Sequence, residues 1–587
     1  MALLQNGFAK SGVTGFYDYP LDQSARISKA DSASIKMPYT SKGTATNLLK
    51  FTFSGWVKRC AVDDSTFHPI ISAGTTTTND TIVFTNVDRL EYNLRISPSI
   101  RSSHYTTAVF RDPSAWYHVV VAYDAANATA ADRCKIYVNG VQQEITVNNA
   151  IETNRVTRFT NNASTDDVYM GYGFRAGSAY YSDMYRAEFH MVDGQTLDPT
   201  YFAEEKSGVW VPKTYEGTYG NNGFYIDFSD TTVSAGSITS VNDSGPNGLD
   251  FDTVTNVEVS DIVPDSPTNN FAVLNNLENN TGQGWPNSYR EGNLRFYLQN
   301  NPGDHNVSGT FALTSGKWYW EQYVEQNYGN AYWAGISQAN LYAVRNFEYG
   351  VGYSASGIVR INGVDDATGL TTYTTGDIVG IAVDMDGGTI DFYVNGSSSV
   401  YQATLPSSIT DNGFKPNTAN GTSGGDQLGI YNFGQDSTFA GNLTAGGNSD
   451  ANGIGDFAYA PPSGYLALCT SNLPDPVFDP AQDATPEDHF NVLTYTGDGS
   501  TSNEINGLTF QPDFVWIKNR NAAWHHVLVD SVRGGSATLA SSAADAEVDP
   551  GGRGYVASFD SDGFTVSSGA SGDERTNDLG VPYVGWN

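Results

Sequence analysis

Trp116-Tyr-His-Val-Val-Val-Ala-Tyr-Asp124, followed after a loop by Lys135-Ile-Tyr-Val-Asn-Gly140, is the stretch that decides the fold. Both segments are rich in β-branched and aromatic residues, which favour strands. The closing pair Asn139-Gly140 tolerates the positive φ angles that a tight hairpin turn needs. The stretch therefore predicts two antiparallel strands of a β-sandwich.

The same plan recurs in the second half of the chain. Gly376-Asp-Ile-Val-Gly-Ile-Ala-Val-Asp384 leads through an Asp386-Gly387 turn to Thr389-Ile-Asp-Phe-Tyr-Val-Asn-Gly396. Each copy joins a strand through an acidic turn to an aromatic strand that ends in Val-Asn-Gly. We interpret the two copies as one sandwich hairpin used twice, rather than as a short-period solenoid repeat.

Turn residues separate short apolar stretches along the whole chain, which contains 61 Gly and 23 Pro. Further strands are predicted at Leu49–Val57, Lys317–Val324 and Phe514–Lys518. One short helix is predicted after Asp198-Pro199, ending at Gly208, because Asp caps and Pro opens a helix well. The predicted fold class is all-β, with tandem antiparallel β-sandwiches.

Composition restricts the function. The chain has 587 residues, and 64 acidic against 31 basic side chains give a net charge of −33. Nucleic acids and anionic membranes both need a cationic surface, so neither is an expected partner. We find no apolar run long enough to cross a membrane.

Cysteine content and the first residues give two further expectations. Three cysteines, Cys60, Cys134 and Cys469, are too few for a disulfide framework, although a contact between Cys60 and Cys134 stays open. The opening residues show no basic region followed by an apolar stretch, so we expect synthesis in the cytoplasm without a signal peptide.

Two parts of the sequence resemble known modules. Phe51-Thr-Phe-Ser-Gly-Trp-Val-Lys58, together with the first hairpin, resembles a laminin-G/concanavalin-A-like jelly-roll domain covering residues 36–212. Gly316-Lys-Trp-Tyr-Trp-Glu321 and Tyr349-Gly-Val-Gly-Tyr353, together with the second hairpin, resemble a SPRY domain covering residues 286–470.

A third resemblance concerns the C-terminal residues 471–587. Val492-Leu-Thr-Tyr-Thr-Gly-Asp-Gly499 and Phe510-Gln-Pro-Asp-Phe-Val-Trp-Ile-Lys-Asn-Arg520 resemble a β module that recurs in bacteriophage virion proteins. Related modules continue further, so the resemblance implies a C-terminal portion that is missing or naturally short. Residues 1–35 are interpreted as a particle-anchoring arm, or else as the first strand of the first sandwich, and residues 213–285 as a connecting segment.

The order of these modules is similar to that of tailed-phage appendages. The resemblance implies a virion structural protein that contacts other virion proteins and attaches to host surface glycans. A tail fibre is the expected type, and a head fibre and a tail decoration stay open as alternatives. A homotrimer is expected by the same analogy. A cellular adhesin is a further alternative, but no anchor for one is visible.

The main enzymatic alternative is a polysaccharide-degrading spike. A glycoside hydrolase needs two carboxylates about 5–10 Å apart. Glu321 and Glu325 lie on one strand at a separation of about 13 Å. Asp384 and Asp386 flank a hairpin turn, and Asp391 is a further candidate on the strand that follows. We therefore expect no enzymatic activity, although an acid pair from different strands stays open.

Candidate binding residues lie in the SPRY-like part and in one acidic loop. Tyr328, Tyr332, Trp333 and Tyr342 could stack on sugar rings, with Trp333 favoured as a core residue instead. Asp166 and Asp167 precede a strand at the position where laminin-G-like domains often bind calcium, so calcium is the one candidate cofactor.

Overall fold

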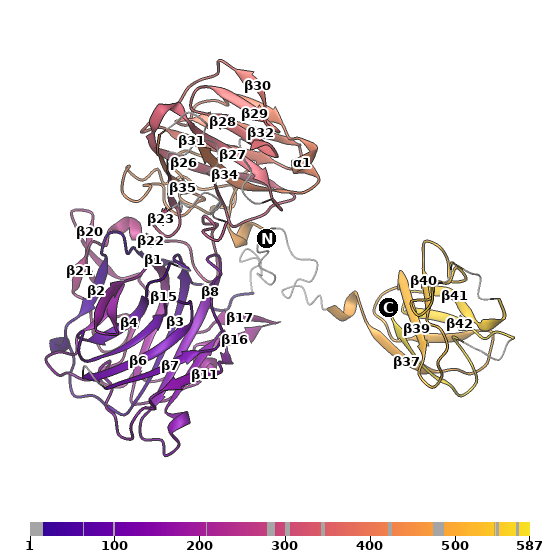
Figure 1. Cartoon of the computed structure of the whole chain (residues 1–587), viewed down its shortest axis with the longest axis horizontal. Helices are drawn as coiled ribbons and strands as arrows, with labels where there is room; N and C mark the ends of the chain where they lie inside the picture. The colour runs from indigo at the N-terminus through magenta and orange to yellow at the C-terminus, as the bar shows by residue number, and fades with distance from the viewer. Residues whose placement is uncertain are drawn as a thin grey trace. The chain divides into compact units, whose positions relative to one another are not determined.

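The computed structural model describes residues 16–62, 64–97, 100–206, 208–278, 288–299, 306–341, 347–420, 425–473, 486–544, 546–547, 551–570 and 575–587. The chain divides between residues 474 and 475 into two compact units. The larger unit contains two β-sandwiches and the smaller unit contains a third pair of sheets (Figure 1). The predicted all-β class with antiparallel sandwiches is confirmed.

The first sandwich packs two large sheets around one core. In spatial order, the described strands of its first sheet are β10 (Val141–Gln142), β9 (Cys134–Val138), β8 (Trp116–Asp124), β3 (Lys50–Arg59), β15 (Met184–Asp193), β1 (Ser24–Ile27) and β22 (Ile262–Val263), with β18 (Phe224–Ile226) also paired to β15. Those of its second sheet are β11 (Ile145–Asn148), β7 (Ile100–Thr106), β6 (Leu90–Ser97), β5 (Asn79–Phe84), β4 (His68–Gly74), β12 (Val168–Met170), β2 (Ser34–Met37) and β21 (Thr253–Thr255).

The predicted hairpin forms between β8 and β9, with Val119 opposite Val138. Asn139 and Gly140 take φ angles of 48° and 78°, as the turn chemistry requires. On the neighbouring β3, alternate side chains enter the core, so Phe51 and Phe53 are fully buried. The other face of β3 is also covered, because Ser54, Trp56 and Lys58 are buried as well.

Small hairpins and one-turn helices complete the first sandwich. The hairpins are β13 (Tyr172–Arg175) with β14 (Ser178–Tyr181), β16 (Ala203–Lys206) with β17 (Val209–Pro212), and β19 (Thr231–Ser234) with β20 (Ser237–Val241). The 3₁₀ turns are η1 (Tyr39–Ser41), η2 (Ala130–Asp132), η3 (Pro199–Tyr201) and η4 (Val259–Asp261). The helix predicted to end at Gly208 is shorter than expected: Asp198 caps it, but it ends after η3 because the chain pairs as β16.

The structure corrects the predicted division of the chain at two places. The described part of the predicted connecting segment 213–285 is not a separate connector, because β18, β21 and β22 all pair with strands of the first sandwich. Residues 24–35 do not belong to an independent arm either, since β1 and β2 lie inside the same two sheets. The first fifteen residues of that predicted arm lie outside the described residues.

The second sandwich has the same plan. In spatial order, the described strands of its first sheet are β23 (Ser288–Arg290), β24 (Arg295–Leu298), β35 (Gln427–Asn432), β26 (Lys317–Asn327), β31 (Ile378–Asp384), β32 (Thr389–Val394) and β33 (Tyr401–Thr404), with the two-residue β36 (Leu466–Ala467) parallel to β26. Those of its second sheet are β25 (Asn306–Ser308), β34 (Phe414–Asn420), β27 (Tyr332–Gln338), β28 (Gly350–Ser354), β29 (Ile358–Ile361) and β30 (Val364–Thr368). Short helices η6 (Tyr328–Asn330), α1 (Ser407–Thr410) and η8 (Thr470–Asn472) lie in its loops.

The second predicted hairpin is also present, with Val383 of β31 opposite Ile390 of β32. Asp384 accepts a 2.6 Å hydrogen bond from the backbone N–H of Gly387 and so fixes the turn. The strands that the sequence repeats therefore occupy matching positions in two successive sandwiches.

A buried ion pair marks the junction between the two sandwiches. Lys58 of β3 and Asp265 lie 2.7 Å apart, and both side chains are fully buried. Lys58 also donates to Asn270 Oδ1 at 2.7 Å, and Trp116 Nε1 donates to Asp265 at 3.2 Å. Next along the chain, Phe271 pairs with Cys469 of the second sandwich. The segment from Asp265 to Phe271 is thereby held by both sandwiches.

The smaller unit contains two antiparallel sheets around a core of its own. One sheet contains β37 (Val492–Thr496), β43 (Pro582–Trp586), β39 (Phe514–Asn519) and β40 (Val527–Asp530). The other contains β38 (Asn503–Asn506), β42 (Gly563–Ser567) and β41 (Tyr555–Asp560), and two 3₁₀ turns, η10 (Pro486–Asp488) and η11 (Gly551–Arg553), complete the described part of the unit.

The three cysteines are buried and free, so Cys60 and Cys134 form no disulfide. Burial raises the pKa of each thiol above its usual value. These residues act as small apolar side chains.

We predict that breaking the Lys58–Asp265 pair on one side destabilises the larger unit. Lys58→Met leaves a buried carboxylate without its cation, and we expect its free energy of unfolding to fall by about 3–5 kcal/mol. Lys58→Met combined with Asp265→Asn removes both charges, and we expect it to recover much of that loss. Chemical denaturation followed by tryptophan fluorescence measures the difference.

Lys135→Met is the matched control, because Lys135 lies 3.7 Å from Asp132 on the surface, where an ion pair contributes less than about 1 kcal/mol. Equal losses for Lys58→Met and Lys135→Met would contradict the structural role of the buried pair.

Candidate functional site

The aromatic residues predicted to bind a glycan do not form one platform. Tyr332 is fully buried in β27, and its hydroxyl donates to Gln322 Oε1 at 3.1 Å. Trp333 is 8% exposed, packs on Phe347 and lies under the guanidinium group of Arg360. Both rings are therefore core residues of this sandwich, because each face of β27 is covered.

Tyr328 and Tyr342 have different outcomes. Tyr328 is 64% exposed in η6, at the end of β26, and its ring lies against Gly425. Tyr342 lies outside the described residues. Of the four predicted aromatic residues, Tyr328 is thus the one that the structure places where a ligand could contact it.

The two candidate calcium ligands have separate partners within the protein. Asp166 is fully buried, forms an ion pair with Arg158 and accepts from Asn161 Nδ2 at 2.6 Å. Asp167 accepts from the backbone N–H of Tyr39 at 2.8 Å and pairs with Lys36. Cations of the protein already occupy both carboxylates, so the geometry does not fit a shared calcium site. Within the described ranges, we find no cluster of three His, Cys, Asp or Glu residues suited to a metal.

The acids considered for hydrolysis are also engaged. Glu321 is buried and accepts hydrogen bonds from Tyr459 N and Ala458 N at 2.8 and 2.9 Å. Burial raises the pKa of Glu321 to about 7, although these donors favour its charged form. Glu325 forms a bidentate ion pair with Arg295.

The turn acids are engaged too. Asp384 pairs with Lys317 at 2.7 Å, Asp386 accepts from Gly316 N, and Asp391 accepts from Ser399 and Gln402. Each of the five acids thus has a structural partner.

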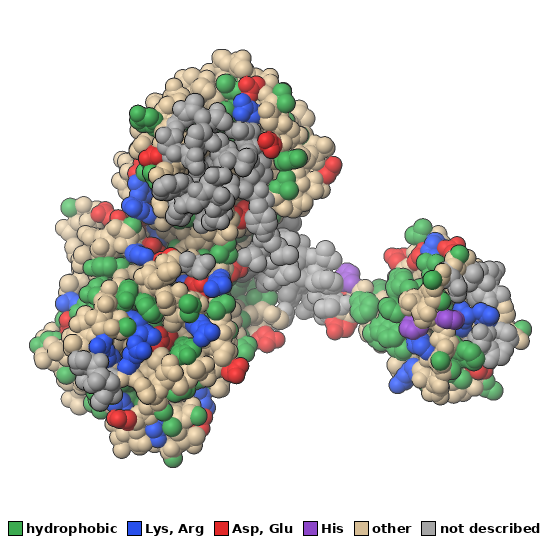
Figure 2. Space-filling model, viewed as in Figure 1, with side chains coloured by type: hydrophobic (Ala, Val, Ile, Leu, Met, Phe, Trp, Pro, Cys, Tyr) green, Lys and Arg blue, Asp and Glu red, His purple; other side chains and the backbone are tan. Residues whose placement is uncertain are grey.

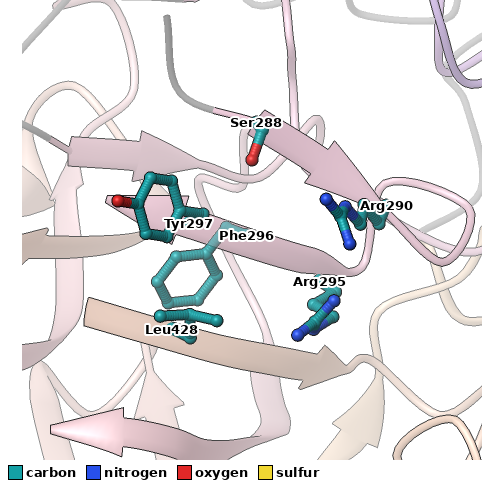
Figure 3. A pocket seen from close by; sticks show the side chains of 6 residues that line it. All are labelled: Ser288, Arg290, Arg295, Phe296, Tyr297 and Leu428. Atoms are coloured by element: carbon teal, nitrogen blue, oxygen red, sulfur yellow. The ribbon is translucent and has the colours of Figure 1, made fainter. Parts of the chain in front are cut away.

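A hollow of about 240 Å³ lies at the edge of the second sandwich, on strands β23, β24 and β35 (Figure 3). Two guanidinium groups lie at one end of it and the Tyr297 hydroxyl lies at the other. We call it the edge hollow; its lining residues are Ser288, Arg290, Arg295, Phe296, Tyr297 and Leu428.

Strand register explains how these residues meet. Ser288 lies opposite Tyr297, and Arg290 lies opposite Arg295. Since alternate residues share one face of a sheet, all four side chains lie on the same outer face. Tyr297 donates to Asp426 at 2.8 Å, and this hydrogen bond raises the pKa of Tyr297.

A larger cleft of about 640 Å³ adjoins the same strand, between the first and second sandwiches. We call it the junction cleft. It adjoins the edge hollow at strand β23, where Ser288 and Arg290 line both cavities. Its other lining residues are Lys29, Ala30, Cys60, Ala61, Val62, Asp64, Ser65, Asp183, Asn276, Tyr289 and Asn293.

The acids of the junction cleft are held by neighbouring groups. Asp64 lies 3.1 Å from Lys29 and 3.0 Å from His68. Burial raises the pKa of Asp64, but the hydrogen bonds and charges of His68 and Lys29 outweigh it and bring the pKa below its usual range. Asp183 accepts from the backbone N–H of Lys29 at 2.8 Å.

A second group of charges lies beside the turn that joins β23 to β24. Arg26 is fully buried and pairs with Asp436 at 3.2 Å and with Asp261 at 3.5 Å. Glu291, in the turn itself, hydrogen-bonds to Asp31 and lies near Arg26. Burial and these neighbouring acids raise the pKa of Asp261 to about 6 and that of Glu291 to about 7.

The comparisons with known proteins agree with this architecture. A concanavalin-A-like lectin/glucanase superfamily model matches residues 30–183, a SPRY domain model matches residues 317–416, and a model of a domain of unknown function, DUF7483, matches residues 485–587. The larger unit therefore contains a concanavalin-A-like domain and a SPRY domain. No curated protein matches the chain.

Solved structures match single parts of the chain. The SPRY domain of human HERC1 is 18% identical, with a TM-score of 0.23, over 27% of this chain and 96% of that chain. A heptameric SAP-like pentraxin from Limulus polyphemus is 13% identical, with a TM-score of 0.22, over 30% and 79%. The CBM40 module of a Ruminococcus gnavus IT-sialidase is 17% identical, with a TM-score of 0.21, over 26% and 80%.

Sequence reasoning missed the residues that line the edge hollow. The available signal was the alternation of Arg295 and Tyr297 with buried Phe296 and Leu298, which indicates a strand with one polar face. That β23 pairs beside this strand, and so adds Arg290, depends on tertiary structure. As for membrane spans, none of the helices in the described ranges is long and apolar enough to be one.

We predict a pH-dependent contribution of Glu291 to stability. Its pKa of about 7 in the folded chain lies above the 4.5 of an unperturbed glutamate. The proton on folded Glu291 therefore stabilises the fold fully below about pH 4.5, and this stabilisation is lost as the pH rises through 7. Glu291→Gln should match the parent near pH 4 and exceed its free energy of unfolding by up to about 3 kcal/mol near pH 8.

Thermal unfolding of the larger unit between pH 4 and pH 8 measures this difference. Glu144→Gln, at an exposed position, is the control and should leave the profile unchanged. Parallel profiles for Glu291→Gln and the parent would show that folding does not raise the pKa of Glu291.

Proposed function

We propose that this chain is a structural protein of a bacteriophage virion, similar to a tail fibre, which attaches the particle to glycans on the host surface. The observation that carries the binding function is the pair of adjoining cavities, the junction cleft and the edge hollow, that share Arg290 and Ser288. Together they combine aromatic, hydroxyl and guanidinium groups, which is the mixture that sugars require. The order of the modules along the chain supports the phage assignment.

Binding is favoured over hydrolysis by the state of the acids. A hydrolase would need two carboxylates that face one another across a bond. Glu321, Glu325 and Asp384 instead each bind a cation or several donors of the protein. The polysaccharide-degrading spike is therefore the second candidate.

We predict that the full chain binds saccharides without cleaving them. A glycan array that includes bacterial surface polysaccharides should give saturable binding, and incubation with each bound polysaccharide should release no reducing ends. Release of reducing ends would favour the spike instead, and the absence of any binding would contradict the proposal. Antibody labelling of particles distinguishes a tail fibre from a head fibre or a tail decoration.

We also propose that the chain forms a homotrimer through its C-terminal unit. The outward positions of the β37–β43–β39–β40 sheet are mostly apolar, whereas a solvated sheet face is usually polar. They include Val492, Phe514, Trp516, Leu528 and Trp586, of which Val492 and Phe514 are more than 40% exposed. Figure 2 shows hydrophobic side chains gathered on one flank of this unit. Three copies of this face can cover one another around a threefold axis, because each apolar sheet face then packs against its two neighbours.

Sedimentation analysis tests the assembly. We expect the parent to sediment at three times its 63.2 kDa mass, and Leu528→Lys to sediment as a monomer because it buries a charge in the contact. Val364→Lys, in exposed strand β30, is the control that should remain trimeric. A monomeric parent would contradict the proposal.

A further inference from the structure

We propose that Arg290 recognises the carboxylate of an acidic sugar that binds across the edge hollow and the junction cleft. This inference rests on the proposed glycan-binding function and names its ligand class. It requires that one cation lining these cavities is not already neutralised by an acidic side chain of the protein.

The other cations near the two cavities are already neutralised. Arg295 binds both oxygens of Glu325, at 2.6 and 2.7 Å. Lys29 lies 3.1 Å from Asp64. Arg26 is buried between Asp261 and Asp436.

Arg290 differs from these three residues. Its side chain is exposed, and it forms no hydrogen bond or ion pair with any residue that the structure describes. Glu291 follows it directly but is buried and turns toward Asp31 and Arg26. The planar guanidinium group of Arg290 is thus available for two parallel hydrogen bonds to a carboxylate.

The neighbouring groups suit the rest of a sugar residue. Ser288, two residues before Arg290 on the same face of β23, offers a hydroxyl that has no partner among the described residues. Tyr297 and Leu428 provide apolar surface for the C–H groups of the ring. Figure 3 places these side chains around one depression, with Arg290 at its end.

The charge of the whole chain favours a single carboxylate over a polyanion. With a net charge of −33, the protein repels nucleic acids and densely sulfated polymers over long range. One guanidinium group within an acidic molecule can bind one carboxylate at short range, where hydrogen-bond geometry adds to the charge.

Calorimetric titration of the full chain with matched saccharides tests the inference. The probes are a disaccharide with a single galacturonate residue against its carboxyl-reduced form, and a sialylated trisaccharide against lactose, so that the two pairs distinguish a uronic acid from a nonulosonic acid. We expect one acidic member to bind at least about tenfold more tightly than its neutral partner, because a hydrogen bond to a charged group is lost in the neutral one.

Substitutions of Arg290 test whether this side chain contacts the carboxylate of the ligand. Arg290→Gln should abolish the preference for the acidic member, and Arg290→Lys should retain a small part of it, since the charge remains but the planar fork is lost. Arg360→Gln, on the other sheet of the same sandwich beside Trp333, is the matched control and should bind as the parent does. Because Arg290 is exposed, we expect both Arg290 variants to keep the melting temperature of the parent.

Two results would overturn the inference in distinguishable ways. If acidic and neutral saccharides bind equally and Arg290→Gln has no effect, the ligand class is wrong while glycan binding stands. If neither these probes nor the array gives binding, both the inference and the proposed function fail. A loss of binding in Arg360→Gln alone would move the site to the surface around Trp333.

Discussion

The buried charge of Lys58 is the constraint on which the larger unit depends. Lys58 projects from β3 away from the core of the first sandwich, and a buried ammonium group must have several acceptors. Asp265, Asn270 and the carbonyl of Phe271 provide them, at 2.7, 2.7 and 2.9 Å. All three acceptors belong to the segment that enters the second sandwich. Because the Lys58 ammonium group must be hydrogen-bonded, these acceptors fix where that segment crosses the first sheet.

The neighbours of Lys58 extend this attachment. Tyr185 of β15, on the same outer face, donates to the carbonyl of Gly292 at 2.9 Å, and Asn293 donates to the carbonyl of Cys60 at 2.8 Å. Gly292 and Asn293 belong to the turn between β23 and β24. The first sandwich therefore holds the turn that positions Arg290 and Arg295, and the junction cleft is a consequence of how the sandwiches are joined.

Local chemistry was enough to predict the two hairpins, because Asn-Gly pairs and β-branched runs act over a few residues. It was not enough for β18, β21 and β22, which have two or three residues and acquire their partners from distant strands. The prediction for Tyr332 and Trp333 did not anticipate that both faces of β27 are covered, since alternation along a strand does not report what lies over the outer face. Arg290 was missed because it lines the cavities only when its strand, β23, pairs with β24 in the folded chain. The sequence does not report that pairing.

Because basic side chains are scarce in this chain, an arginine without an acidic partner is an unusual feature. With 31 basic side chains against 64 acidic ones, any cation that folds near an acid is readily neutralised. Arg26, Lys29, Lys58 and Arg295 all follow this rule. Arg290 departs from this rule, because it lines two cavities while the acids beside it bind other partners. In an acidic chain that departure maintains a local site for a negative group, which the surrounding charge alone would exclude.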